Sequence, residues 1–314
     1  MLQDPEHWIW DSWIADDGER YHLFFLKAPA ALKDPALRHE AAVIGHASST
    51  DLVDWAVHPD ALTPGRHAAW DDLALWTGSV ARGADGVWRM YYTALNTSGG
   101  HGVRDQQIGL AESDDLMRWR RVGDLPLVAP DPRWYRTHEA GVSETWRDPF
   151  VFVHDGVWHM LITARATTAR RLGDGVIGHA TSPDGRTWEL QPPLGAPAGF
   201  GQLEVMQVRE VDGRWLLVFT CHPDEQSESQ RLSFGNFSTW MVAADSPLGP
   251  FDLTRAKPLK TDPKLFAAPL VQTRDGEWVF IGFRNTEPEG ELNFHIVDPI
   301  PFSSSLTANR SPRR

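Results

Sequence analysis

The sequence contains a single cysteine, Cys221, among its 314 residues. One cysteine cannot form an internal disulfide, and it cannot supply the several thiolates of a cysteine-based zinc site. Long apolar runs are also missing, since no stretch approaches the ~18 consecutive apolar residues that a membrane-spanning helix needs. We therefore expect neither a disulfide framework nor a membrane span.

Basic residues are in the minority, because 30 Lys and Arg stand against 42 Asp and Glu and give a formal net charge of -12. Binding to a nucleic-acid backbone needs a basic face, so we expect no nucleic-acid partner. The first eight residues lack the basic and apolar regions of a secretory signal. We expect a cytoplasmic protein; the sequence does not indicate its oligomeric state.

Helical periodicity is weak, and the 15 tryptophans occur among glycines and prolines, a composition that favours β structure. An internal repeat organises these residues. Residues 45–55, 109–119 and 178–188 all carry Gly, Ala, Ser, Asp and Trp at the same five positions. A degenerate fourth copy covers residues 240–251. Each copy is typical of a strand, a Ser/Asp turn and a tryptophan-bearing strand.

A second signature, an Asp-Gly pair followed by an aromatic-rich strand, occurs five times, at residues 17–25, 85–92, 155–162, 212–219 and 275–281. An Asp-Gly pair between two strand-like runs is a strong hairpin signal. The two signatures together predict an all-β, five-bladed β-propeller with blades at about residues 6–62, 70–128, 143–194, 200–258 and 264–302. Residues 1–302 would form one domain, followed by a polar tail at 303–314. A β-sandwich with accidental repeats is the alternative.

Three blades of this propeller carry an acidic residue near the start of the strand that should line the central channel. Asp11, Asp148 and Glu204 lie seven, eight and nine residues before the glycine of the next Asp-Gly turn. Taken singly, Asp11 could form a turn, Asp148 could pair with Arg147, and Glu204 could face solvent. Together they should converge at one end of the channel, where mutual repulsion raises at least one pKa. A carboxylate and a protonated acid are the minimal equipment for glycoside hydrolysis.

These segments resemble the furanosidase propellers of glycoside hydrolase clan J, families 32 and 68, which include invertases, levanases and levansucrases. Trp-Asp-Ser-Trp at 10–13 is similar to the nucleophile motif of family 68, and Leu-Trp-Thr-Gly-Ser-Val at 75–80 to a sugar-contacting segment of both families. Trp-Arg-Asp-Pro-Phe at 146–150 resembles their Arg-Asp-Pro motif. The context of Glu204 differs, with Val-Met-Gln where the families have Cys-Pro or Arg-Pro after the acid.

The resemblance implies a retaining β-fructofuranosidase-type enzyme acting on sucrose or fructo-oligosaccharides, with water or a second sugar as acceptor. It implies Asp11 as nucleophile, Glu204 as acid/base and Asp148 as transition-state stabiliser. Contacts with the sugar are implied for Trp10, Trp76, Ser79 and Arg147.

The same resemblance implies no metal and no cofactor, and 314 residues leave no room for the C-terminal β-sandwich common in family 32. Residues 131–144 could cover the mouth of the channel or be a plain linker. The alternatives are an arabinofuranosidase or xylosidase similar to family 43, and a propeller that binds sugars without turning them over.

Overall fold

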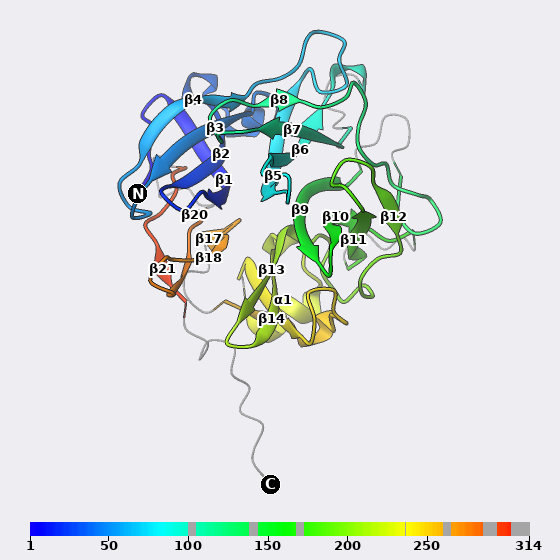
Figure 1. Cartoon of the computed structure of the whole chain (residues 1–314). Coiled ribbons are helices and arrows are strands. Elements are labelled where there is room, and N and C mark those ends of the chain that lie inside the picture. Colours follow the sequence, from blue (N-terminus) through cyan, green and yellow to red (C-terminus); the bar gives the residue numbers. More distant parts are fainter. Residues whose placement is uncertain are drawn as a thin grey trace.

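A computed structural model describes residues 1–99, 105–137, 144–167, 173–235, 237–259, 265–284 and 294–302. Its strands form sheets arranged as a ring around a common centre (Figure 1). Four of these sheets have four antiparallel strands each, in chain order, and the last part of the ring holds a three-stranded and a two-stranded sheet. The chain is therefore a five-bladed β-propeller, as the repeats predicted. Residues 303–314, the predicted tail, lie outside the described residues.

The sheets follow the predicted blade ranges. Blade one holds β1 (His7–Asp16), β2 (Tyr21–Pro29), β3 (Val43–Ser49) and β4 (Ala56–Leu62). Blade two holds β5 (Ala74–Arg82), β6 (Trp88–Leu95), β7 (Gln107–Ser113) and β8 (Arg120–Arg121). Blade three holds β9 (Trp146–His154), β10 (Val157–Arg165), β11 (Gly175–Ser182) and β12 (Glu189–Gln191). Blade four holds β13 (Glu204–Val211), β14 (Arg214–Thr220), β15 (Thr239–Ala244) and β16 (Lys257–Pro258).

Blade five holds β17 (Leu265–Phe266), β18 (Leu270–Gln272), β19 (Trp278–Phe280), β20 (Phe283–Arg284) and β21 (Ile300–Pro301). The described part of the chain has one α-helix, α1 (Glu228–Phe234). Its 3-10 turns are Ala30–Leu32, Pro35–Glu40, Thr97–Gly99, Pro223–Glu225 and Leu253–Arg255. None of the described helices is long and apolar enough to cross a membrane.

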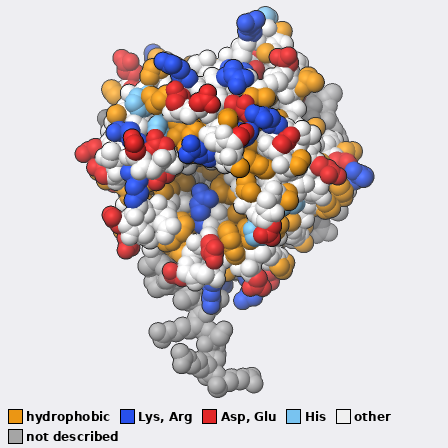
Figure 2. Space-filling view, viewed as in Figure 1, with side chains coloured by type: hydrophobic (Ala, Val, Ile, Leu, Met, Phe, Trp, Pro, Cys, Tyr) orange, Lys and Arg blue, Asp and Glu red, His pale blue; other side chains and the backbone are white. Residues whose placement is uncertain are grey.

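The two ends of the propeller are joined by backbone hydrogen bonds. Leu2 N donates to Ile296 O and Ile296 N donates to Leu2 O, both at 3.0 Å, and Ile296 also bridges to Phe283 of β20. The N-terminal segment thus extends the last blade before the chain enters the first. The space-filling view shows the resulting ring hollowed at its centre, with basic and apolar side chains in the hollow (Figure 2).

The repeated Ser and Asp form the turn between the third and fourth strands. In blade one, Asp51 Oδ1 accepts the backbone N–H groups of Val53 and Asp54, both at 2.9 Å, and Ser49 Oγ donates to the same oxygen at 2.8 Å. Asp115 and Asp184 make the equivalent contacts in blades two and three. The repeated Asp therefore accepts hydrogen bonds from backbone N–H groups of the turn, which would otherwise have no partner within the protein.

The repeated glycine has a packing reason. A Cβ added to Gly45 would lie 2.4 Å from the ring of Phe25, and one added to Gly109 would lie 2.5 Å from Trp70. In blades one and two, aromatic rings therefore close over the backbone of the third strand, where no larger residue fits. This contact explains why aromatic strands and small-residue strands alternate in the sequence.

Candidate active site

The two aspartates enter the site through bulges in inner strands. The register between β1 and β2 shifts between Trp10 and Ser12, which leaves Asp11 out of the ladder with a φ of 27°. Asp148 lies at the corresponding shift in β9 and has a φ of 56°. A bulge re-aims a side chain, and a positive φ in a non-glycine residue is a strain that the surrounding structure must offset. Both carboxylates are thereby turned out of their sheets.

Glu204 stands one register position earlier than the aspartates. It pairs with Thr220 within the ladder, and the bulge follows it at Val205, whose φ is 49°. Glu204 therefore corresponds to Trp10 and Arg147 of the other blades. Asp11, Asp148 and Glu204 lie seven, eight and nine residues before the glycine of the next Asp-Gly turn. The increase has two causes: the bulge of β1 is one residue shorter than those of β9 and β13, and Glu204 precedes its bulge.

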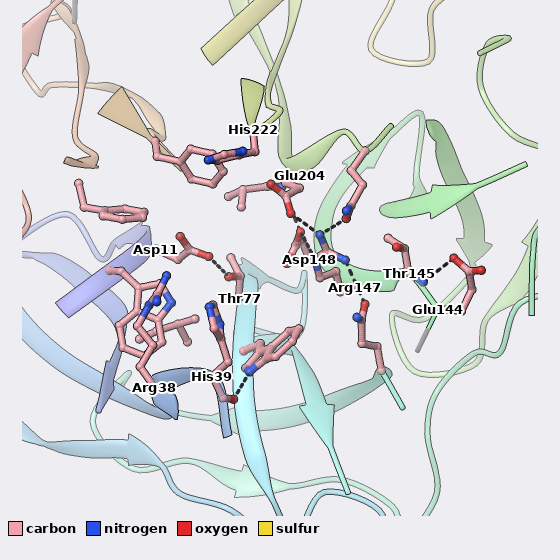
Figure 3. Close-up of a pocket in the computed structure, with 18 of the residues that line it drawn as sticks. Asp11, Arg38, His39, Thr77, Glu144, Thr145, Arg147, Asp148, Glu204 and His222 are labelled. Carbon is pink, nitrogen blue, oxygen red and sulfur yellow. Dashed lines mark hydrogen bonds and ion pairs between the residues drawn. The ribbon is translucent and has the colours of Figure 1, made fainter. Parts of the chain in front are cut away.

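A pocket of about 470 Å³ opens at this end of the inner strands. Every blade contributes to its wall. The inner strands and their bulges supply Trp10, Asp11, Trp76, Thr77, Arg147, Asp148, Glu204, Val205 and Phe266. Asp11 lies on one side of the cavity, and Arg147, Asp148 and Glu204 lie on the opposite side (Figure 3). The three acids that the sequence singled out thus line a single cavity.

Asp11 is held by a residue of the neighbouring blade. Thr77 Oγ1 donates a hydrogen bond of 2.6 Å to Asp11 Oδ2. Burial raises the pKa of Asp11 to about 7; the Thr77 hydrogen bond opposes this rise, the charges of Asp148 and Glu204 add to it, and Arg38 opposes it. Asp11 therefore changes its charge near neutral pH.

Asp148 is more deeply enclosed, with 4% of its surface exposed. Its Oδ2 accepts hydrogen bonds from Thr163 Oγ1 at 3.0 Å and from the N–H of Val205 at 3.3 Å. Burial raises the pKa of Asp148 to about 6; Arg147 opposes the rise, and Glu204 adds to it. These contacts fix the orientation of the carboxylate toward the pocket.

Arg147 is shared by two of the three acids. Its Nη2 contacts Glu204 Oε1 and Gln202 Oε1, and its Nε lies 3.4 Å from Asp148 Oδ2. Its Nη1 donates to Gln106 Oε1 at 3.2 Å. The guanidinium is thus both the ion-pair partner of Asp148 and a clamp on Glu204.

The two tryptophans predicted to contact the sugar line the pocket. Trp76 Nε1 donates to the backbone oxygen of His39 at 2.7 Å, which fixes the indole against the 3-10 turn at Pro35–Glu40. Arg38 of the same turn lies 5.5 Å from the centre of the Trp10 ring. Both indoles are anchored by this turn, which also brings Arg38 and His39 into the wall.

Ser79 is not among the residues that line this pocket. Its Oγ donates to Pro149 O at 2.7 Å and accepts from the N–H of Val151 at 3.0 Å. The hydroxyl therefore ties β5 to β9 inside the ring. A sugar contact by Ser79, implied by the resemblance, has no geometric support.

Thr77 is the site residue that sequence reasoning missed. It occupies the bulge of β5, the position that Asp11 and Asp148 occupy in β1 and β9. The register shift between Trp76 and Gly78 identifies it, and that shift is a property of the strand pairing that the sequence does not display. His222 and Gln202 were also missed, because they follow or precede strands in loops that the repeat does not cover.

Residues 131–144 reach the pocket at their end. Glu144 lines it and lies 3.2 Å from Arg136 Nε through its Oε2. Residues 138–143, the central part of the segment predicted either to cover the channel mouth or to be a linker, lie outside the described residues. Within the described ranges, no group of three or more His, Cys, Asp or Glu side chains is arranged to hold a metal ion.

Two carboxyl groups across a cavity from each other, a third that is buried beside a guanidinium, and two indoles in the same pocket wall can grip and cleave a glycosidic bond. A ring of five blades with such acids at one channel mouth is the architecture of a propeller-type glycoside hydrolase. The chain belongs to glycosyl hydrolases family 32: the model of the family's N-terminal domain matches residues 3–291.

Two relatives illustrate what this chain is similar to. An insoluble β-fructofuranosidase isoenzyme of Oryza sativa subsp. indica is 28% identical over 230 residues, which cover 68% of this chain and 34% of the rice protein. A sucrose-6-phosphate hydrolase of Klebsiella pneumoniae is 27% identical over 278 residues, covering 87% of this chain and 54% of that protein. The chain thus spans between a third and about half of these relatives.

A solved structure shares the fold. An inulosucrase from Halalkalicoccus jeotgali, bound to kestose, superposes with a TM-score of 0.71 at 24% identity and covers 92% of this chain and 79% of that chain. The propeller architecture is therefore common to this chain and to that protein.

Proposed function

We propose that this protein is a retaining glycoside hydrolase of β-fructofuranosides such as sucrose or fructo-oligosaccharides. The convergence of Asp11, Asp148 and Glu204 on one cavity, with Asp11 opposite Glu204, carries the proposal (Figure 3). Retaining glycosidases use two carboxyl groups that flank the scissile bond, one as nucleophile and one as acid/base. The names of the relatives supply the sugar, a fructofuranoside.

In the first step, the ionised carboxylate of Asp11 attacks the anomeric carbon of the fructosyl unit. The bond between that carbon and the glycosidic oxygen breaks, and a covalent ester of Asp11 forms. Thr77 holds Asp11 Oδ2 through its hydroxyl, so the carboxylate is positioned before substrate arrives. Its pKa of about 7 means that the nucleophile becomes available as the pH rises through neutrality.

Glu204 supplies the proton that the leaving oxygen takes up. In the second step it removes a proton from water, whose oxygen attacks the anomeric carbon; the bond from that carbon to Asp11 breaks, which releases fructose and the free carboxylate. Arg147 Nη2 contacts Glu204 Oε1, and its Nε lies 3.4 Å from Asp148 Oδ2, so one guanidinium positions both carboxyl groups beside the bond that breaks.

Asp148 acts on the charge that develops at the ring. Positive charge grows on the fructosyl unit as the bond breaks, and a buried carboxylate aimed at that unit stabilises it. The hydrogen bonds from Thr163 and Val205 N leave Asp148 Oδ1 to accept from sugar hydroxyls. Trp10 and Trp76 present apolar ring surface to the sugar.

The acceptor and the leaving group define the finer activity. Water gives hydrolysis and a sugar hydroxyl gives fructosyl transfer, and the same two steps serve both. Arg38 and His39 line one side of the pocket and His222 another (Figure 3), and the guanidinium of Arg38 would also accommodate a phosphorylated leaving sugar, the substrate in the name of the Klebsiella relative.

Incubation with sucrose, sucrose-6-phosphate and kestose tests the proposal. Release of fructose, or formation of a longer fructan, is expected from at least one of them, and Asp11→Asn should abolish it. NMR of the first product should show retained anomeric configuration. Binding of these sugars without any turnover would support the alternative of a non-catalytic sugar-binding propeller.

Membership of family 32 sets aside the arabinofuranosidase and xylosidase alternative, which rested on family 43. We also propose a cytoplasmic location, supported by a single, buried, unpaired Cys221. Disulfides are typical of proteins in oxidising compartments, and a chain with a single cysteine cannot form an internal disulfide. Cell fractionation tests the location.

A further inference from the structure

A second pocket of about 200 Å³ lies at the other end of the inner strands. The active-site pocket uses residues 10–11, 76–77 and 147–148, whereas this one uses residues further along the same strands, 12–14, 78–80 and 150. Val205 lines both pockets. The two cavities are therefore back to back along the channel, and we call the second one the lower pocket.

The lower pocket contains a cation without an acidic partner. Arg209 Nε donates to Leu270 O at 3.1 Å, and its Nη1 donates to Val208 O at 3.2 Å. An arginine has five N–H donors, so three remain. No carboxylate of the described residues forms an ion pair with Arg209, and its guanidinium lies 5.0 Å from the centre of the Phe150 ring. Burial lowers the pKa of Arg209 to about 10, which leaves it charged at neutral pH.

Other polar groups of the wall also lack acceptors. Ser12 Oγ and Trp13 Nε1 are buried and have no hydrogen-bond partner among the described residues. The one carboxylate of the wall, Asp16, already has an ion-pair partner, because both of its oxygens contact Arg274. Buried polar groups are nearly always paired with protein, water or ligand. The wall therefore has an excess of donors and of positive charge.

We propose that the lower pocket binds a small oxyanion, either a carboxylate or a phosphate, through Arg209. An oxyanion supplies the acceptors that Arg209 lacks, and a planar guanidinium matches carboxylate and phosphate oxygens in bidentate fashion. Rotation of the Ser12 side chain would add its hydroxyl as a further donor. Trp13, Phe150 and Trp278 also line the pocket and give it apolar surface beside the guanidinium.

The volume fits this ligand. A water molecule takes up about 30 Å³ of liquid, so the pocket accommodates several non-hydrogen atoms. Phosphate and acetate fit within it, whereas an oligosaccharide does not. The inference stands apart from the proposed activity, because it is tested by binding alone.

Isothermal titration with inorganic phosphate and with acetate, each at pH 7 and constant ionic strength, tests the proposal. Saturable one-site binding of at least one anion to the native protein is expected. Arg209→Met should weaken it about tenfold or more, and Ser12→Ala about threefold. Arg66→Met is the matched control, because it removes the same charge from an exposed position and should leave the affinity unchanged.

Two results would overturn the inference: no saturable binding of either anion, or equal affinity in Arg209→Met and Arg66→Met. The second would mean that the anion binds elsewhere, for example beside Arg38 in the active-site pocket. If circular dichroism shows that Arg209→Met does not fold, Arg209→Lys and Ser12→Ala decide the matter. Arg209→Lys keeps the charge and loses the planar fork, so unchanged affinity in both variants would also reject the site.

Discussion

Thr77 Oγ1 donates a hydrogen bond of 2.6 Å to Asp11 Oδ2 and so links the second blade to the proposed nucleophile of the first. The bond favours the ionised form of Asp11, against burial and against the charges of Asp148 and Glu204. Thr77, at the bulge of β5, thereby lowers the pKa of Asp11 in β1 and favours its ionised, nucleophilic form.

Replacing Thr77 with valine should lower activity mainly through this pKa. Without the hydroxyl, the pKa of Asp11 rises further, and the acid limb of the kcat/KM profile should move upward by about 0.5 to 1 pH unit. We expect about a three- to tenfold loss of kcat/KM at pH 6, measured with sucrose or the substrate identified as above. Thr77→Ser is the control, since it keeps the hydroxyl. An unshifted acid limb in Thr77→Val would contradict the role.

The native protein should show an acid limb in kcat/KM between about pH 6 and 7. The pKa values of Asp148 and Asp11 are raised to about 6 and about 7, so both carboxylates become ionised as the pH rises through this window. Because the two interact, the limb reports apparent values of the pair. Initial rates from pH 4 to 9 check this, and a profile that is flat from pH 5 to 8 would disprove it.

Asp11→Asn should stabilise the fold at high pH. The folded-state pKa of Asp11, about 7, lies above its ordinary value of 3.8, so the folded state holds more protons between these values. Stability therefore falls as pH rises from about 4 to 7, and the neutral amide removes that loss. We expect a gain of about 2 kcal/mol at pH 8, shrinking to nothing below pH 4, from denaturant unfolding. A destabilised variant at pH 8 would contradict this.

Arg147→Met should strongly lower the catalytic rate. The substitution leaves Glu204 and Asp148 without their shared cation, and Asp148 loses the main opponent of its raised pKa. We expect kcat to fall by about 10²- to 10³-fold and the acid limb to move upward. Arg147→Lys, which keeps the charge, should recover part of the loss. Equal activity of the two variants would show that charge at this position is unimportant.

Ser79→Ala should affect stability and leave substrate binding alone. The change removes the acceptor of Val151 N and the donor to Pro149 O inside the ring. Unfolding free energy should fall by about 1–3 kcal/mol, with a melting temperature several degrees lower. KM should stay within about twofold of the native value, since the hydroxyl contributes no uniform binding energy. A raised KM at unchanged melting temperature would restore Ser79 as a sugar contact.

Local sequence determined the blades. Asp-Gly turns with positive φ at Gly18, Gly86 and Gly156 form hairpins from neighbouring residues alone, and the Ser/Asp turn is satisfied within five residues. The Asp-Gly signature occurs five times and the Ser/Asp turn recurs in the first three blades, so the number of blades and the convergence of their first strands follow from local patterns. Blade five, whose strands form two separate sheets, is the least regular of the five blades.

By itself, therefore, the sequence determined the propeller and the mouth at which Asp11, Asp148 and Glu204 meet. Tertiary structure decided what those acids touch. Thr77 reaches Asp11 across 66 residues, Arg147 reaches Glu204 across 57, and Ser79 reaches Pro149 across 70. Those contacts depend on bulges that shift the register by one residue between blades, and a one-residue shift changes which side chain faces the cavity. No local pattern carries that information, because it arises only when neighbouring blades pack.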